Sequence, residues 1–182
     1  MLKIDMRLYT IGHGTVSEEA FVALLRELGI ARLVDVRTAP GSRRHPHFRR
    51  DEMERWLPPV DVKYRWEKAL GGFRRPSPDS PNIALRHPAF RGYADYMRTP
   101  EFWIALDGVL SDANEAPTAV MCSESVWWRC HRRLLSDAGA LLRGAEVLHL
   151  MHDGRIVPHR ATEGVRVDGD LLVYDGGQMM LG

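Results

Sequence analysis

The sequence predicts an α/β fold with one domain over residues 1–182, in which helices flank a mostly parallel sheet and a β-hairpin follows near the C-terminus. Three observations support this prediction. Strand-helix-strand patterns occupy residues 7–36 and 118–150, and a hairpin signal lies within residues 163–175. With 182 residues, 45% of them hydrophobic, the chain is long enough to bury a core.

The first unit starts with a β-prone segment at residues 7–11, which ends in the tripeptide GHG. Ser17 is a suitable N-cap for a helix, because its hydroxyl can accept a hydrogen bond from a free backbone N–H. Apolar residues then recur at helical spacing, and Gly29 ends the helix. The mostly apolar residues 31–36 form the next strand, so the helix connects two parallel strands.

The middle of the chain is less regular. Asp51 and Glu54 have the spacing of a capping box for a short helix that runs to Trp56, and residues 62–66 are a candidate strand. Residues 70–88 carry four prolines and two glycines. We expect them to form a long ordered loop over the functional site.

Two helices are expected next, at about residues 90–98 and 101–110. Thr99 precedes the second one as its N-cap, and Pro100 occupies its first position, where the missing N–H of proline costs nothing. These helices connect the proline-rich loop to the second half of the sheet.

The second unit comprises a strand at residues 118–121, a helix at 130–142 with one apolar face, and a strand at 146–150. After it, the dipeptide Asp168-Gly169 interrupts an alternating segment and indicates a two-residue hairpin turn. The chain shows no internal repeat and no low-complexity tract.

Composition indicates a cytoplasmic protein. No window approaches the roughly 20 apolar residues of a membrane span, and two cysteines do not make a disulfide framework. Residues 37–98 hold 14 Lys and Arg against 7 Asp and Glu, a net charge of +7, whereas the rest of the chain carries −6. Such a basic segment can attract a phosphate-bearing partner, although a solvated arginine-rich face with no ligand explains it equally well.

Chemically active side chains follow three of the expected strands. Since the carboxyl ends of parallel strands meet at one edge of a sheet, we expect these side chains to form a common site. The candidate catalytic residues are His13, Asp35, Cys122, Glu124 and His131, and the candidate substrate- or anion-binding residues are Arg37, Ser42, Arg43, Cys130 and Arg132.

Cys122 lies where a strand gives way to a loop and a helix. A helix N-terminus and nearby cationic groups would lower the pKa of its thiol and make it a nucleophile. The alternative is an inert buried cysteine that packs as a small hydrophobic residue. A zinc site is a further alternative, with Cys122, Cys130 and His131 as candidate ligands, but the spacing is not that of a structural finger.

Trp127 and Trp128 lie in the same loop as the cysteines. One of them can stack on a planar ligand such as a nucleobase. The simpler interpretation is that both pack the loop onto the domain.

Several separated motifs occur in order between about residues 8 and 160: YTIGHG, LVDVRTAPGSR, LGG, FRGYADYM, and MCSESVWWRCHR, with a later HL and PH. Together they resemble domain-of-unknown-function family 488. The resemblance implies an α/β fold and a shared site at His13, Asp35, Arg37, Ser42, Cys122, Glu124, Cys130, His131 and Arg132. It implies no reaction, and the Trp127-Trp128 pair departs from the polar residues often found there in the family.

We expect a small cytosolic enzyme, a hydrolase or transferase, that acts on an anionic, phosphate-bearing substrate such as a nucleotide or nucleic-acid end. The arginines would bind the anion, a histidine oriented by Asp35 or Glu124 would move a proton, and Cys122 would be the nucleophile or a polar contact. One alternative is a non-catalytic module that binds nucleic acid through residues 37–98. Another is a metal-binding or redox-sensing domain in which Cys122 and Cys130 form a disulfide.

Overall fold

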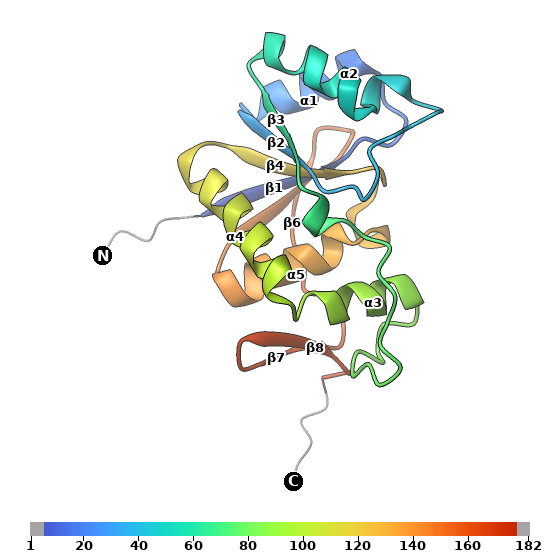
Figure 1. The fold of residues 1–182 in the computed structure, drawn as a ribbon. Helices are drawn as coiled ribbons and strands as arrows, with labels where there is room; N and C mark the ends of the chain where they lie inside the picture. The colour runs from blue at the N-terminus through green and yellow to red at the C-terminus, as the bar shows by residue number, and fades with distance from the viewer. Residues whose placement is uncertain (1–5, 178–182) are drawn as a thin grey trace, which may run out of the picture.

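A six-stranded sheet forms the centre of the computed structural model, which describes residues 6–177 (Figure 1). The strand order is β3-β2-β4-β1-β5-β6. The first five strands in this order are parallel and β6 runs antiparallel to β5, which confirms the predicted α/β class. The strands are β1 Arg7–Gly12, β2 Arg32–Asp35, β3 Lys63–Trp66, β4 Thr118–Cys122, β5 Glu146–Leu150 and β6 Ile156–Pro158.

Strand β4 lies between β1 and β2, and β1 lies between β4 and β5. Each of the two predicted strand-helix-strand units therefore crosses over one strand of the sheet. In the register, Gly12 pairs with Cys122 and Asp35 pairs with Met121. The carboxyl ends of β1, β2 and β4 therefore lie level at one edge of the sheet, and the loops that follow them meet there.

Five helices cover the two faces of the sheet (Figure 1). Residues of α1 and α2 pack with Leu33 and Met121, whereas residues of α3, α4 and α5 pack with Val34 and Val120 on the opposite face. Neighbouring residues of a strand thus point to opposite faces, and all five residues of β4 are buried. The helices are α1 Glu18–Glu27, α2 Arg50–Trp56, α3 Pro88–Tyr96, α4 Pro100–Glu115 and α5 Arg132–Arg143.

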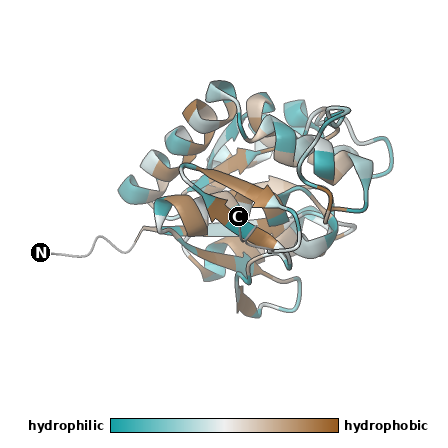
Figure 2. Cartoon of the chain, turned by 90° about the horizontal axis from the view of Figure 1, so that it is seen from below, coloured by the Kyte–Doolittle hydropathy of each residue, from teal (hydrophilic) through white to brown (hydrophobic). Residues whose placement is uncertain are grey.

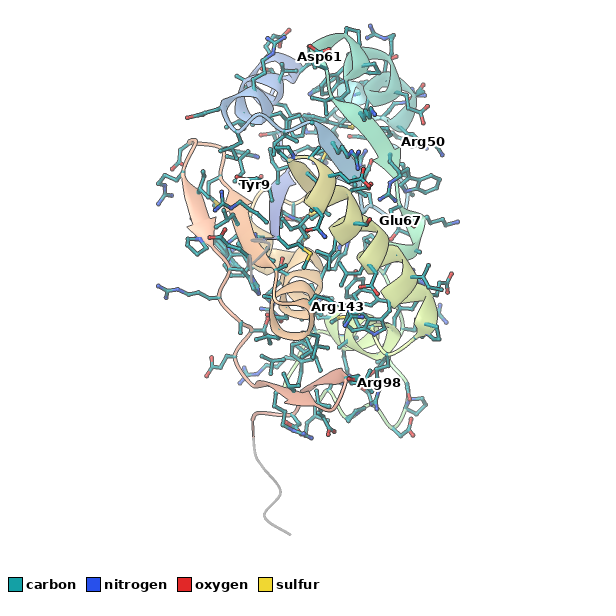
Figure 3. All side chains as sticks on the ribbon, turned by 90° about the vertical axis from the view of Figure 1, so that its left-hand side faces the viewer. Tyr9, Arg50, Asp61, Glu67, Arg98 and Arg143 are labelled. Atoms are coloured by element: carbon teal, nitrogen blue, oxygen red, sulfur yellow. The ribbon has the colours of Figure 1, made fainter. Side chains whose placement is uncertain are left out.

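The hydropathy colouring follows the same layers. The strands are mainly hydrophobic, and the helices turn hydrophilic residues outward (Figure 2). Side chains fill the space between the sheet and its helices (Figure 3). Four short 3-10 turns lie in the loops: η1 Pro46–Phe48, η2 Pro58–Val60, η3 Lys68–Leu70 and η4 Trp127–Arg129.

Two of the predicted helix caps are present and one is wrong. Ser17 accepts a hydrogen bond from the backbone N–H of Ala20, and Thr99 accepts one from Phe102. The capping box at Asp51 is absent, because α2 begins at Arg50 and has no side-chain cap. Its acidic residues form surface ion pairs instead, Asp51 with Arg49 and Glu54 with Arg50.

The C-terminal hairpin consists of β7 Val165–Asp168 and β8 Leu171–Tyr174. Its turn is Gly169-Asp170, one residue later than predicted, because Asp168 pairs with Leu171. Gly169 has a φ of 61°, which glycine adopts without strain. The hairpin forms its own two-stranded sheet beyond α3 and α5, and Leu172 and Tyr174 join the core beside them (Figure 1).

The proline-rich segment has no regular structure between η3 and α3, as expected. Asp95 of α3 anchors it by accepting hydrogen bonds from Ser77, Ser80 and Asn82. Between residues 6 and 177, no helix is long and apolar enough to cross a membrane. The prediction of a single domain over residues 1–182 includes residues 1–5 and 178–182, which lie outside the described part of the chain.

Candidate functional site

A cavity of about 870 Å³ opens at the sheet edge where β1, β2 and β4 end. The loop that contains Gly72 and Phe73 and the N-terminal part of α3 complete its walls. Seven of the ten predicted site residues line it, namely His13, Arg37, Ser42, Cys122, Glu124, Cys130 and His131. The other three, Asp35, Arg43 and Arg132, lie behind or outside this lining.

Cys122 and Cys130 form a contact pair at the cavity. Cys122 is the last residue of β4, and Cys130 precedes α5. Their sulfur atoms are 2.6 Å apart, and both residues are buried, with 2% and 5% of their surface exposed. Two cysteines separated by seven residues in the chain therefore act as one chemical unit.

Arg132 lies behind this pair. Its Nε is 3.0 Å from the sulfur of Cys122 and 3.4 Å from that of Cys130, so one N–H is shared by two sulfurs. Its other nitrogens donate to Thr10 and to the backbone carbonyl of Glu124. Since Arg132 is 1% exposed, it does not reach the cavity, and its position does not fit the expected anion-binding role.

The loop that holds the cysteines requires a glycine at position 12. A Cβ atom there would lie 1.6 Å from the carbonyl oxygen of Glu124 and 2.8 Å from a nitrogen of Arg132. The close approach of the β1 backbone to this loop thus explains Gly12 better than a tight turn does. It lets the loop fold down onto Arg132.

The two thiols differ in acidity. Burial by itself would raise the pKa of Cys130, but the hydrogen bond from Cys122 and the neighbouring His131 and Arg132 outweigh it and hold that pKa well below the usual range. Burial and the hydrogen bond to Cys130 raise the pKa of Cys122. These opposite shifts make Cys130, and not the expected nucleophile Cys122, the more acidic thiol of the pair.

His131 lies against Cys130. Its Nε2 is 2.9 Å from the carbonyl oxygen of Val36 and so carries the hydrogen that it donates. In the neutral ring, Nδ1 then has a free lone pair, and it lies 3.9 Å from the sulfur of Cys130. Gly72 packs over this ring, since a Cβ there would lie 3.0 Å from Nδ1.

Asp35 orients Arg37 and does not contact a histidine. The guanidinium of Arg37 donates to both carboxylate oxygens of Asp35, at 2.8 and 2.6 Å, and Tyr64 donates to the same carboxylate. A further nitrogen of Arg37 is 3.3 Å from Nε2 of His13. Glu124, the other expected partner of an imidazole, has an exposed side chain with no hydrogen bond between residues 6 and 177.

His13 is a neutral residue in this arrangement. Burial, followed by the charge of Arg37, lowers its pKa to about 4. Its Nδ1 donates to the carbonyl of Gly14, and Nε2 accepts from Arg37. The ring stacks on Phe48 with 4.3 Å between centroids. This packing holds the imidazole in place, so His13 has little freedom to turn and transfer a proton.

Ser42 and Arg43 occupy the loop after β2. Ser42 lines the cavity, and its hydroxyl also accepts a hydrogen bond from the backbone of His45. Arg43 is exposed and outside the cavity lining. Of these two predicted anion-binding residues, only Ser42 can therefore contact a ligand in the cavity, through its hydroxyl.

A buried chain of hydrogen bonds extends from Arg132 away from the cavity, and the sequence did not reveal it. Arg132 donates to Thr10, which is 2.7 Å from Nδ1 of His149. Nε2 of His149 is 2.9 Å from Nδ1 of His159, whose Nε2 is 2.8 Å from Asp137. With both rings neutral, every hydrogen in this chain points from Arg132 and Thr10 toward the carboxylate. The register of β1 and β5 brings its first members together, since Thr10 pairs with His149.

The two tryptophans of the loop have different surroundings. Trp127 stacks on His149 at 4.2 Å and nearly parallel, so it packs the loop onto the domain. Trp128 is 46% exposed and lines the cavity. Trp128 is therefore the better placed of the two to contact a ligand in this cavity.

Metal binding finds little support. Nowhere in residues 6–177 do three or more His, Cys, Asp or Glu side chains gather in a way that could hold a metal ion. Cys122, Cys130 and His131 lie together, but Arg132 places a positive charge beside both sulfurs, which disfavours a second cation there.

Five of the fourteen basic residues of the segment 37–98 are neutralised within the fold. Arg37, Arg49, Arg50, Arg55 and Arg65 each form an ion pair with an acidic residue. An extended nucleic-acid surface would need these charges to be free.

Comparison with known proteins gives one result. The family model described as "Domain of unknown function DUF488" matches residues 17–139, about two thirds of the chain. No curated protein and no solved structure matches the chain. The matched region contains both cysteines, His131 and Arg132, whereas His13, His149 and His159 lie outside it.

Proposed function

Because the chain belongs to the family of unknown function DUF488, whose description assigns no activity, we propose a function from the site itself. The protein is an enzyme that uses the thiolate of Cys130 as a nucleophile on an anionic, phosphate-bearing substrate. We place the protein in the cytosol, where reducing conditions would keep both thiols free of disulfide bonds.

The observation that carries this proposal is the set of donors around one sulfur. Cys130 receives hydrogen bonds from the backbone N–H and from Nε of Arg132, and from the thiol of Cys122. A buried guanidinium with no partner of opposite charge is costly. Arg132 has no ion pair with any carboxylate of the described chain, so the thiolate is the anion that balances it.

The neighbouring groups suit covalent catalysis. The sulfur of Cys130 would form a bond to the electrophilic atom of the substrate, and the leaving group would depart with its electron pair. Because Cys130 attacks as the thiolate, the proton for the leaving group would come from the neighbouring thiol of Cys122. Nδ1 of His131 can then take a proton from the water or second acceptor that attacks the intermediate. Water or a second acceptor then releases the product, which corresponds to a hydrolase or a transferase.

The cavity walls favour a negatively charged substrate. Arg129 is exposed at the cavity and has no ion pair among residues 6–177. Ser42 and Ser123 add hydroxyl groups, and Glu124 is the only acidic residue of the lining. Guanidinium and hydroxyl groups are common ligands of phosphate oxygens.

Alkylation tests the proposal directly. The native protein is treated with iodoacetamide at neutral pH, and the modified cysteine is identified by mass spectrometry. We expect modification of Cys130 at a rate above that of an ordinary thiol, loss of it in Cys130→Ser, and its persistence in Cys122→Ser, where the hydroxyl still donates. If Cys122 alone reacts, or if neither thiol reacts before unfolding, the proposal is wrong.

A second candidate function is redox sensing, which the 2.6 Å distance between the two sulfurs favours. With a peroxide as oxidant, Cys130 would form an S–O bond as the O–O bond breaks. Cys122 would then attack that sulfur and expel hydroxide, which takes up the thiol proton as water, leaving a disulfide. A mass lower by two hydrogens after peroxide treatment, and reversed by a thiol reductant, would support this function.

A further inference from the structure

A second cavity of about 740 Å³ lies next to the first, and no function has been assigned to it above. The two cavities share His87, Phe90 and Trp128 in their walls. We propose that they form one extended substrate site for a nucleotide unit. Its phosphate binds to Arg86, Arg133 and Arg160 in the second cavity, its base stacks on Trp128, and its reacting atom lies at Cys130. This inference rests on the proposed function and specifies its substrate.

The charge of the second cavity supports an anionic ligand. Arg86, Arg133 and Arg160 line it, together with one acidic residue, Glu163. None of these three arginines forms an ion pair with a carboxylate in residues 6–177. Arg133 is partly buried, whereas Arg86 and Arg160 are exposed. The partly buried Arg32 and Arg166 pair with acidic residues, so Arg133 differs from them in having no carboxylate to balance its charge.

Two polar atoms at this cavity also lack partners. Nε of Arg133 is enclosed and has no hydrogen-bond acceptor, and the hydroxyl of Thr162, a residue 9% exposed, has none within the described residues. The guanidinium of Arg133 lies 5.1 Å from the ring centre of Phe90, which holds it at the cavity wall. Buried polar groups are normally satisfied, and a phosphate presents several acceptor oxygens to such donors.

Aromatic rings stand at the boundary of the two cavities. Trp128 contacts Trp127 edge-on at 5.7 Å, and 46% of it is exposed. Phe73 lines the first cavity, is 88% exposed and has a φ of 57°, which is strained for a bulky residue. Exposed rings held in fixed positions beside cations are the combination that binds nucleobases and phosphates.

The combination selects the ligand class. A lone inorganic anion would not require an aromatic wall, and an acidic peptide would not require a flat exposed ring. The joint size of the two cavities suits a ligand larger than a phosphate ion. A nucleotide, free or at the end of a strand, satisfies both requirements.

Binding measurements on the full chain test the inference. The probes are adenosine monophosphate and a short single-stranded oligonucleotide with a 5′-phosphate, titrated by calorimetry at low salt. The variants are Arg133→Gln, Arg160→Gln and Trp128→Ala. Arg98→Gln is the matched control, since Arg98 is exposed, lies outside both cavities and is labelled in Figure 3. Thermal melting verifies that each variant is folded.

We expect each of the three variants to weaken binding roughly tenfold and the control to bind like the natural protein. Binding of both probes identifies a nucleotide, and binding of the oligonucleotide alone identifies a strand end. If neither probe binds, or if the variants bind as well as the control, the inference is wrong. Alkylation of Cys130 distinguishes the two proposals. If Cys130 is reactive and no nucleotide binds, the proposed function stands and this inference is wrong. If a nucleotide binds and Cys130 is unreactive, the site binds nucleotides and the proposed function is wrong.

Discussion

Arg132 donates twice to Cys130: its backbone N–H is 3.2 Å and its Nε 3.4 Å from the sulfur. The first contact arises because Cys130 lies just before α5, where backbone N–H groups have no partner within the helix. The second requires the side chain to fold back beneath the loop. Together they place a cation and a helix N-terminus at one sulfur, and both lower the pKa of a thiol.

Replacement of Arg132 should therefore slow the chemistry of Cys130. In Arg132→Gln the cation is lost, and we expect the pKa of Cys130 to rise, with alkylation at neutral pH roughly tenfold slower for each unit by which this pKa exceeds 7. The measurement is the alkylation rate as a function of pH. Arg133→Gln is the neighbouring control and should leave this profile unchanged. An unaltered profile in Arg132→Gln would show that Arg132 does not stabilise the thiolate.

Acidification should destabilise the protein through His13. Its pKa is lowered from 6.5 to about 4 in the folded protein, so between these values the unfolded chain binds the extra proton. The free energy of unfolding is therefore highest above about pH 6.5, and it falls by roughly 3 kcal/mol as the pH drops to about 4. His149, whose pKa is lowered to about 2, acts in the same direction.

Denaturant unfolding at several pH values checks this prediction. The free energy of unfolding should fall from pH 7 to pH 5, and His13→Asn should show a shallower fall because it lacks one of the titrating groups. Equal slopes in the two proteins would contradict the assignment of His13 as a buried neutral residue.

The buried chain of hydrogen bonds should contribute to stability through Asp137. This carboxylate is fully buried and accepts from His159, Thr162 and Tyr174. We expect Asp137→Asn to lower the free energy of unfolding by about 1–3 kcal/mol, because an amide cannot accept from all three donors. Asp153→Asn, which removes an exposed acid paired with Arg155, should lower the free energy of unfolding much less, because solvent screens that ion pair. Similar losses of unfolding free energy in the two variants would show that the buried hydrogen bonds of Asp137 do not add to stability.

Glycine substitutions should have opposite effects at two positions. Gly12→Ala inserts a methyl group against the backbone of Glu124, so we expect a displaced cysteine loop, a less stable protein and a slower alkylation of Cys130. Gly108 lies within α4 with open space around it, and Gly108→Ala should stabilise the protein by up to about 1 kcal/mol. Thermal melting and alkylation of both variants measure these effects. Normal alkylation in Gly12→Ala would show that the loop tolerates the change.

Local features of the chain were predictable from the residues themselves. Ser17 and Thr99 cap their helices because a hydroxyl next to free backbone N–H groups needs no distant partner. Strand β6 was missed, since three residues with no clear alternation become a strand only by pairing with β5. The capping box at Asp51 failed for a related reason: the N-cap is Arg49, two residues earlier, and the acidic residues of the helix form surface ion pairs.

The location of the candidate site could be predicted from the sequence, but its chemistry could not. The strand order and register put His13, Arg37 and Cys122 at one cavity, which followed from parallel strands ending at the same edge. Which arginine is buried and which is free depends on contacts across the fold. Arg37 is held by Asp35, and Arg132 by two sulfurs.

From its residues alone, the chain determined most of its strands, the approximate place of its helices and the edge where reactive groups meet, because these depend on short-range geometry and on hydrophobic periodicity. Only the tertiary structure decided that Cys130 is the more acidic thiol, that His149 and His159 join Arg132 to Asp137, and that three arginines of a second cavity lack acidic partners in the described residues. The acidity of a thiol and the pairing of a charge depend on atoms within a few ångströms, and those neighbours come from distant parts of the chain.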